Sequence, residues 1–202
     1  MLKTKIAVLV SGGGTTLQAL IDAQKSGIIK SGEIALVVSN NANAYAIQRA
    51  YENNIPCVVI IKKECGSQEA FEQKIIEELN NHHIDMIVLA GFMSILSADF
   101  TSAYPKRILN VHPSLIPSFC GKGFYGLKVH QAALDYGVKV TGATVHYVNE
   151  VPDGGEIILQ KAVSIRSGDT AEVLQKRVMR QAEWKILPQA TEMVAKRLTE
   201  EK

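Results

Sequence analysis

The sequence predicts an α/β protein with a Rossmann-like, mostly parallel, twisted sheet and helices on both faces. The first indication is the alternation of short apolar runs with amphipathic runs, which is typical of a parallel sheet covered on both sides. The second is the chain of 202 residues, 47% of them apolar, which is enough for one sizeable core. The third is a glycine-rich turn, Ser11-Gly12-Gly13-Gly14, directly after the first apolar run.

The first half of the chain has the pattern of a repeated strand–helix unit. Strands are expected at residues 5–10, 33–39, 57–61 and 85–90, and helices at residues 15–25, 42–53 and 67–80. Leu17, Leu20 and Ile21 recur at helical spacing and give the first helix one apolar face. Because the strands are apolar along nearly their whole length, both faces of the sheet should be covered.

The second half departs from this repeat. We expect a short helix at 97–104, a short strand at 108–111, a loop rich in Pro, Gly and Ser at 113–126, and a helix at 127–136. Strands at 140–148 and 156–163 are joined by a link too short for a parallel crossover, so they should be antiparallel. A long C-terminal helix at 170–199 should be kinked at Pro188. No linker divides the chain, which predicts a single domain over residues 1–202.

The composition excludes several classes of protein. The 22 Lys and Arg against 20 Asp and Glu leave a net charge of +2, which argues against a strongly basic nucleic-acid binder. The longest apolar stretch, residues 84–93, is shorter than the roughly 18 residues of a membrane span and contains Asp85. Cys57, Cys65 and Cys120 are odd in number and have neither CxxC nor zinc-site spacing. Since the N-terminus also lacks a signal-peptide pattern, we expect a reduced, cytoplasmic protein with no metal, nucleic-acid or membrane partner.

The glycine turn has the geometry of a phosphate site. Glycines let a ligand approach the backbone closely, and the N-terminus of the following helix offers unpaired N–H groups. Thr15 and Thr16 add hydroxyl donors. A dinucleotide fingerprint would need a third glycine where Leu17 stands, and a P-loop would need a lysine after Gly14. The turn therefore suits one phosphate on a small sugar, with a tight turn that binds no ligand as the alternative.

Asn110 and His112 stand at the end of a predicted strand, where ligands bind in open α/β sheets. Alternation along the strand places them on one face, so an amide donor lies beside a titratable imidazole. Such a pair can stabilise an oxyanion and move protons. Asp153, followed by two glycines, could approach the same site. The alternative for a lone His112 is a buried structural histidine, and His130 and His146 could be structural or line a site.

Six segments, taken in order, resemble one known family. They are residues 10–18 (VSGGGTTLQ), 89–96 (LAGFMSIL), 110–117 (NVHPSLIP), 130–134 (HQAAL), 142–146 (GATVH) and 153–155 (DGG). Together they resemble the phosphoribosylglycinamide formyltransferases of purine (IMP) biosynthesis, from the first strand to the last helix. The resemblance implies a one-carbon transferase that moves the formyl group of 10-formyltetrahydrofolate to the amine of N1-(5-phospho-D-ribosyl)glycinamide.

The resemblance implies that Asn110, His112 and Asp153 are the catalytic residues. Asn110 would donate a hydrogen bond to the oxyanion that develops as the amine attacks the formyl carbon. His112, held in its charged form by Asp153, would stabilise the oxyanion and act as the acid. Asp153 would also accept or relay, through water, the proton that the amine must lose.

The resemblance implies two sets of binding residues as well. Gly14, Thr15 and Thr16 match the positions that hold the ribonucleotide phosphate, and Glu183 matches the acidic position near the glycinamide end. Met93, Ser94, Ile95, Leu96 and Asn110 match the folate-binding positions. By periodicity alone, residues 93–96 would belong to the core and Glu183 to a solvated helix face.

Three features depart from the usual pattern of the family. Thr16 replaces an amide side chain in the glycine turn, and Gln68 stands where many members have a basic residue that meets the folate tail. The loop at residues 118–126 is longer than in some members. We therefore assign no ligand contacts to that loop.

Other functions remain as alternatives. A 10-formyltetrahydrofolate hydrolase shares the Asn-His-Asp core but usually has an N-terminal regulatory domain, and methionyl-tRNA formyltransferase adds a C-terminal domain. The first strand begins at Lys5 and the chain ends at Lys202, so neither addition is expected here. A non-catalytic sugar-phosphate-binding module would need the glycine turn but not the three catalytic residues. The sequence is compatible with a monomer or a homodimer.

Overall fold

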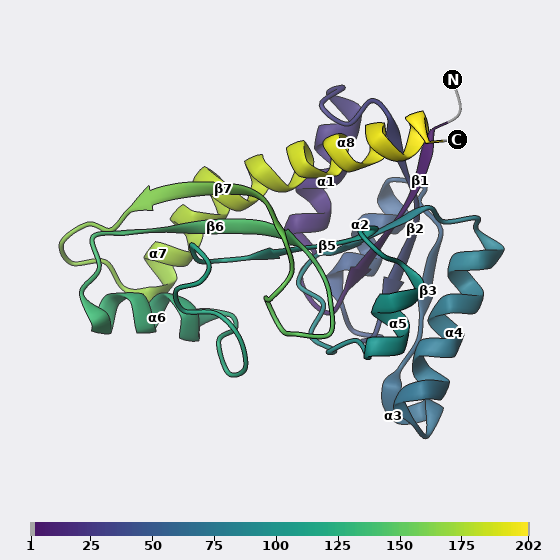
Figure 1. Ribbon diagram of the computed structural model, residues 1–202, viewed down its shortest axis with the longest axis horizontal. Helices are drawn as coiled ribbons and strands as arrows, with labels where there is room; N and C mark the ends of the chain where they lie inside the picture. The colour runs from purple at the N-terminus through teal and green to yellow at the C-terminus, as the bar shows by residue number, and fades with distance from the viewer. Residues whose placement is uncertain (1–2, 202) are drawn as a thin grey trace.

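The computed structural model describes residues 3–201, whose strands form one seven-stranded sheet in the order β3-β2-β1-β4-β5-β6-β7 (Figure 1). The strands are β1 (Thr4–Val10), β2 (Gly32–Ser39), β3 (Cys57–Val59), β4 (Met86–Leu89), β5 (Ile108–His112), β6 (Val140–Tyr147) and β7 (Ile157–Ser164). The first five strands are parallel, whereas β6 runs antiparallel to both β5 and β7. The mostly parallel sheet with an antiparallel strand toward the C-terminus is therefore confirmed.

The helices follow the predicted order. They are α1 (Thr15–Lys25), α2 (Tyr45–Glu52), α3 (Lys62–Cys65), α4 (Gln68–Asn81), α5 (Ala98–Ala103), α6 (Leu127–Tyr136), α7 (Ala171–Val178) and α8 (Trp184–Glu200), with a π-helical turn, η1 (Met179–Glu183), between the last two. The four-residue helix α3 was not expected from the sequence. Within residues 3–201, no helix is long and apolar enough to cross a membrane.

The central strand β1 shows why the strands are apolar on both sides. Ile6, Val8 and Val10 point into one buried cluster. Ala7 and Leu9, which alternate with them, point into a second cluster on the opposite face. The first cluster is completed by α1, α2, α7 and α8, and the second by α4 and α5, so helices cover both faces of the sheet (Figure 1).

The long C-terminal helical run is interrupted once by a π-helical turn. The run is present, but Pro188 lies inside α8, and the change in hydrogen-bonding pattern lies earlier, in η1. Pro188 has no N–H to donate to the carbonyl of Trp184, so one intrahelical hydrogen bond is missing within α8. Glu183 is the last residue of this π-helical turn and is only 8% exposed.

The strand order also positions the functional site. β2 lies on one side of β1 and β4 on the other, so the direction of chain progression reverses at β1. Ligands bind beyond the carboxyl ends of the strands at such a reversal. In this protein the ends of β1, β4 and β5 lead into the glycine turn, into residues 90–97 and into residues 113–126.

Candidate functional site

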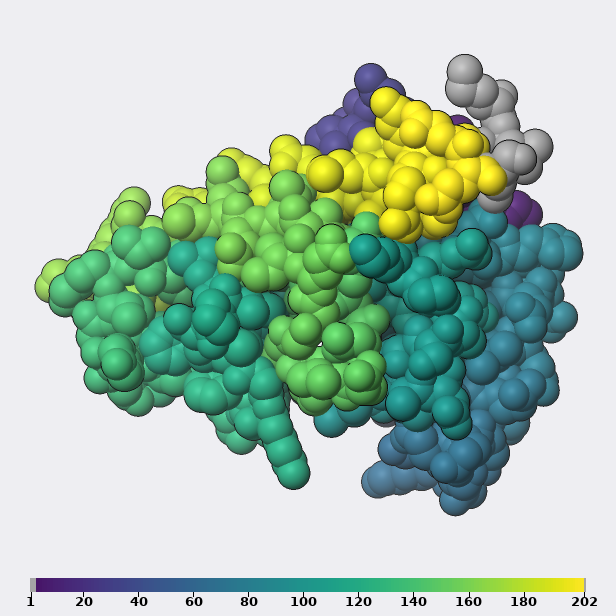
Figure 2. All heavy atoms as spheres, in the orientation of Figure 1, coloured from purple at the N-terminus to yellow at the C-terminus, as the bar shows by residue number. Residues whose placement is uncertain are grey.

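A cleft of about 740 Å³ opens at these strand ends. Its walls are the glycine turn, the segment after β4, the end of β5, parts of the loops that follow β5 and β6, and the inner side of α7 and η1. All the residues proposed from the sequence line it: Gly14, Thr15, Thr16, Met93, Ser94, Ile95, Leu96, Asn110, His112, Asp153 and Glu183. In Figure 2 the loop at residues 118–126 projects from the surface, and a hollow separates its tip from the α3–α4 end.

The glycine turn forms one end of the cleft. Gly14 is the N-cap of α1 and has φ 68°, in the left-handed region that favours glycine. A Cβ atom at Gly14 would stand 2.7 Å from the Cβ of Ala46 on α2, so α2 packs directly behind the turn. At Gly12 and Gly13 a Cβ would meet no atom of the described part of the chain within 4 Å. The turn is therefore closed on the α2 side and open elsewhere.

The segment after β4 lines the cleft with apolar side chains. Met93 and Ile95 are 61% and 70% exposed, whereas Leu96 is buried against α4 and α5. The interpretation of this segment as core therefore holds for Leu96 and is wrong for Met93 and Ile95. Exposed apolar side chains at a cleft are typical of a surface that binds a ligand or partner.

Side-chain hydrogen bonds fasten this segment on two sides. The Met93 N–H donates to Ser11 Oγ over 2.8 Å, which ties the segment to the glycine turn. On the other side, the Gln68 amide donates to the carbonyl oxygen of Ile95 over 3.2 Å and to the buried carboxylate of Glu72 over 2.5 Å. Gln68, whose role was left open, thus contacts this segment directly.

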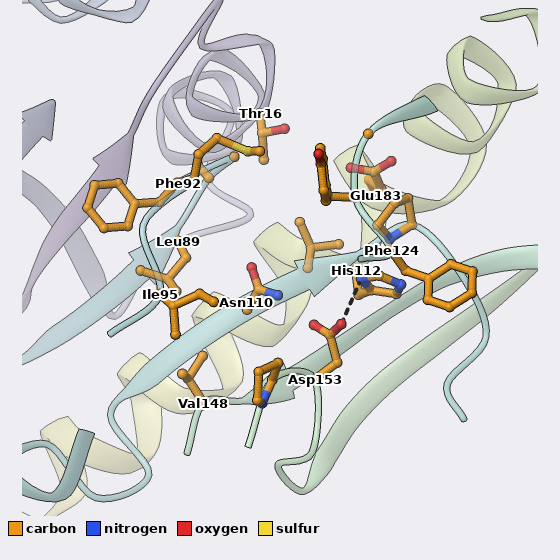
Figure 3. A pocket seen from close by; sticks show the side chains of 18 of the residues that line it. Thr16, Leu89, Phe92, Ile95, Asn110, His112, Phe124, Val148, Asp153 and Glu183 are labelled. Carbon is orange, nitrogen blue, oxygen red and sulfur yellow. Dashed lines mark ion pairs between the residues drawn. The ribbon is translucent and has the colours of Figure 1, made fainter. Parts of the chain in front are cut away.

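His112 and Asp153 form the centre of the cleft. His112 Nδ1 lies 3.3 Å from Asp153 Oδ2, and both side chains are largely buried (Figure 3). The other ring nitrogen, Nε2, lies 2.8 Å from the carbonyl oxygen of Phe119. Because a carbonyl can only accept, Nε2 carries a proton. Figure 3 shows Asn110 beside this pair, as strand alternation predicts.

Burial and the Asp153 carboxylate act in opposite directions on the pKa of His112. Burial lowers the pKa of His112 below its ordinary 6.5, and this outweighs the Asp153 carboxylate and the Phe119 carbonyl, which both raise it. Asp153 thus favours the charged form of His112, as expected, but in the free protein the effect of burial is larger. For Asp153, burial raises the pKa, but the neighbouring His146, the hydrogen bond from the Gly121 N–H and the nearby His112 together bring the pKa below its usual value.

His146 on β6 is a member of the site that the sequence left undecided. In the β5–β6 pair it lies opposite Asn110. Its Nδ1 lies 2.8 Å from the carbonyl of Tyr147, so the proton is assigned to Nδ1. Its Nε2 then accepts from the Asn110 amide over 3.2 Å and lies 3.6 Å from Asp153 Oδ1. Strand pairing, which single-sequence patterns do not supply, was the missing signal.

The loop at residues 118–126 also contributes to the site, although no contacts were assigned to it. Besides the Phe119 carbonyl on His112, the Gly121 N–H donates to Asp153 Oδ2 over 2.8 Å. Phe119 and Gly121 both have positive φ, at 51° and 86°. The loop thus supplies a backbone acceptor to the imidazole and a backbone donor to the carboxylate.

Glu183 and His130 are buried titratable groups along the same cleft. Burial raises the pKa of the Glu183 carboxyl to about 7, so the interpretation as a solvated helix residue is wrong. His130 is 0% exposed, and neither ring nitrogen has a hydrogen-bond partner among residues 3–201. Burial, with a smaller effect from His112, lowers the pKa of His130 to about 4. Within residues 3–201, no group of three or more His, Cys, Asp or Glu could hold a metal ion.

Comparison with known proteins assigns the chain to a family. Residues 4–191 match the family model described as formyl transferase. The chain belongs to the formyl transferase family. The family expected from the six sequence segments is therefore confirmed, and with it the Rossmann-like α/β fold.

Several formyl transferases and related proteins are similar over most of this chain. The phosphoribosylglycinamide formyltransferase of Haemophilus influenzae is 43% identical over 184 residues, which cover 91% of this chain and 84% of that protein. The trifunctional purine biosynthetic protein adenosine-3 of Gallus gallus is 44% identical over 193 residues, covering 96% of this chain but 18% of that protein. The crystal structure of glycinamide ribonucleotide transformylase 1 from Symbiobacterium toebii has a TM-score of 0.89 at 39% identity, with 96% of this chain and 88% of that chain covered.

Proposed function

We propose that this chain is a phosphoribosylglycinamide formyltransferase of IMP biosynthesis. It transfers the formyl group of 10-formyltetrahydrofolate to the amine of N1-(5-phospho-D-ribosyl)glycinamide, giving the N-formyl product and tetrahydrofolate. The main support is the convergence of Asn110, His112 and Asp153 in one cleft, between a phosphate-type turn and an apolar surface. The names of the Haemophilus influenzae and Symbiobacterium toebii proteins agree with this activity.

Asn110 stabilises the oxyanion in this mechanism. When the amine attacks the formyl carbon, the carbonyl π electrons move onto oxygen, and a buried negative charge needs a donor placed in advance. One N–H of the Asn110 amide is directed at His146 Nε2, which fixes the orientation of the side chain. The amide has a second N–H that is available to the oxyanion.

His112 and Asp153 carry out the proton transfers of the reaction. The developing oxyanion favours the charged form of a nearby imidazole, so the reaction itself raises the pKa that burial has lowered in the free protein. His112 takes up a second proton at Nδ1, where it faces Asp153, and donates from Nε2 to the oxyanion, which takes the place of the Phe119 carbonyl. When the intermediate collapses, the bond between the formyl carbon and N10 breaks, and N10 leaves as tetrahydrofolate with a proton equivalent to the one that the amine has lost. Asp153 accepts or relays, through water, the proton that the attacking amine loses.

The ribonucleotide lies between the glycine turn and η1 in this proposal. Its phosphate binds at Gly14, Thr15 and Thr16, where the N-terminus of the eleven-residue helix α1 offers N–H groups and a partial positive charge. At the other end, Glu183 holds the glycinamide amine. Because its pKa is about 7, the Glu183 carboxyl can be ionised when it meets an ammonium group and neutral when it does not.

The folate occupies the apolar part of the cleft. Met93, Ser94, Ile95 and Leu96 line it with Asn110, and Leu89 and Val148 add apolar surface on the same side (Figure 3). An apolar cleft with a few polar groups suits a flat heterocycle that has both donors and acceptors. In this role 10-formyltetrahydrofolate is a co-substrate, and the transfer step needs no metal.

The remaining expectations are proposals of the same kind. We propose that residues 1–202 act as one formyltransferase domain, in a cytoplasmic protein, as a monomer or homodimer. Its partners are the two small-molecule substrates and neither nucleic acid nor a membrane.

An absorbance assay for the loss of formyl-folate tests the proposed function. Turnover that requires glycinamide ribonucleotide, with formation of the N-formyl product, is the expected result. Equal turnover without the ribonucleotide would show a hydrolase instead. Binding of the ribonucleotide with no turnover in the presence of formyl-folate would point to a sugar-phosphate-binding module.

A further inference from the structure

Helix α2 accounts for the direction of the carbonyl groups in the glycine turn. The N–H of Ala46, in the first turn of α2, donates to the carbonyl oxygen of Gly12 over 3.1 Å. One helical turn further along, Nε of Arg49 donates to the carbonyl oxygen of Gly13 over 2.9 Å. Two successive carbonyl groups of the turn are therefore held toward α2.

The guanidinium of Arg49 is itself fixed in place. Its Nη1 donates to Gln18 Oε1 on α1 over 3.1 Å, and its Cζ lies 5.0 Å from the centre of the Tyr45 ring. Arg49 thus joins α1, α2 and the turn between β1 and α1. Its aliphatic stem also lies against the turn, since a Cβ at Gly14 would stand 3.2 Å from Arg49 Cδ.

These contacts carry an electrostatic consequence for anion binding. A carbonyl oxygen that faced a phosphate would repel it, whereas a carbonyl held on the opposite side leaves the N–H groups of the turn to face the anion. The guanidinium also places a permanent positive charge directly behind the turn.

We propose that Arg49 is a positioning residue of the phosphate site. It holds the Gly13 carbonyl away from the ligand and adds a favourable field, without touching the reacting atoms. The inference rests on the proposed function only in taking the ligand of the glycine turn to be a phosphate group.

The test compares Arg49→Met and Arg49→Lys with a matched control, Gln48→Ala. Gln48 is the neighbouring residue on α2, is exposed, and donates to Glu52 on its own helix. The dissociation constant of inorganic phosphate is measured by calorimetry, and KM is measured separately for the ribonucleotide and for formyl-folate. Circular dichroism and thermal melting confirm that each variant is folded.

We expect Arg49→Met to weaken phosphate binding and raise the KM for the ribonucleotide by about ten- to a hundredfold, because it removes the charged donor whose hydrogen bond orients the Gly13 carbonyl. The KM for formyl-folate should change less than twofold or so, Arg49→Lys should lie between wild type and Arg49→Met, and Gln48→Ala should match wild type. An unchanged phosphate affinity in Arg49→Met, or equal rises in both KM values, would overturn the proposal.

The two proposals fail separately in this design. If wild type does not transfer a formyl group to the ribonucleotide, phosphate affinity still tests Arg49. If transfer proceeds and Arg49→Met binds phosphate as wild type does, the role of Arg49 is wrong and the proposed function stands.

Discussion

His112 and Asp153 face each other over 3.3 Å, and each changes the proton affinity of the other. Burial lowers the pKa of the imidazole, and the carboxylate partly restores it. The balance favours the neutral imidazole in the free protein, and its proton then lies on Nε2, which faces the Phe119 carbonyl. This leaves Nδ1 facing a carboxylate, an arrangement that favours the uptake of a second proton as negative charge develops nearby.

Replacing Asp153 by Asn tests this balance. The carboxylate raises the pKa of His112, so its removal should move that pKa further below 6.5. Titration of the His112 ring by NMR in wild type and in Asp153→Asn measures the shift. Formyl transfer should fall by about 10²–10⁴-fold in Asp153→Asn and in His112→Ala, as is typical for general acid–base groups. A His112 pKa that stays constant or rises in Asp153→Asn would contradict the assigned coupling.

Burial of Glu183 disfavours the ionised carboxylate and so lowers the stability of the folded chain at high pH. Its pKa in the folded chain is about 7, above the ordinary 4.5, so between these pH values the unfolded chain loses a proton that the folded chain keeps. The free energy of unfolding therefore falls as the pH rises from 4.5 through 7. Glu183→Gln cannot ionise. At pH 8 the variant should be more stable than wild type by about 3 kcal/mol, and this advantage should vanish near pH 4.5.

Denaturant unfolding of both proteins at pH 4.5 and pH 8 measures the Glu183 effect. The proposed amine contact adds a second expectation, a higher KM for the ribonucleotide in Glu183→Gln. If Glu183→Gln and wild type differ in stability by the same amount at both pH values, burial does not raise the pKa of Glu183 in the folded chain.

In the turn between β1 and α1, Gly13 and Gly14 are glycine for different reasons. Gly14 has a positive φ and lies against the backbone of α2, so it is required by conformation and packing. Gly13 has neither constraint and lines the cleft. A phosphate that approaches the turn would be the reason for glycine at that position.

A pair of alanine variants tests the two constraints. Gly14→Ala should lose about 1–3 kcal/mol of stability, because a Cβ there is both strained and 2.8 Å from Ala46 Cα. Gly13→Ala should fold with nearly unchanged stability but raise the KM for the ribonucleotide about tenfold, with little change for formyl-folate. Thermal melts and paired KM measurements provide the comparison. Wild-type KM values in Gly13→Ala would show that the glycine turn does not bind the phosphate.

The whole molecule is a sheet buried between two helical layers, and this architecture sets its response to acid. His130 is fully buried on α6 as a neutral imidazole with a pKa of about 4, against an ordinary 6.5. The unfolded chain binds a proton in this interval that the folded chain does not. Because of His130, the free energy of unfolding therefore decreases by about 3 kcal/mol as the pH falls from 6.5 toward 4.

His130→Leu removes this titration and tests it. Between pH 7 and pH 4, the variant should lose about 3 kcal/mol less free energy of unfolding than wild type does. An identical acid loss in wild type and His130→Leu would show that the buried imidazole does not oppose protonation.

Much of the fold follows from local sequence patterns. The order of strands and helices depends on periodicity and on turn residues that lie next to one another in the chain, so it could be predicted. The pairing of β6 with β5, which sets His146 opposite Asn110, depends on segments more than thirty residues apart. Likewise, the contacts of Phe119 and Gly121 arise from a loop without periodicity, in which no local pattern predicts the backbone direction.

The sequence alone determined the α/β class, the glycine turn before a helix, and the shared strand face of Asn110 and His112. Each of these follows from backbone geometry within a few neighbouring residues. Tertiary structure alone decided the lowered pKa of His112, the burial of Glu183 and the place of Arg49 behind the turn. Burial and electrostatic energies are sums over every group that packs around a side chain, and those groups come from distant parts of the chain.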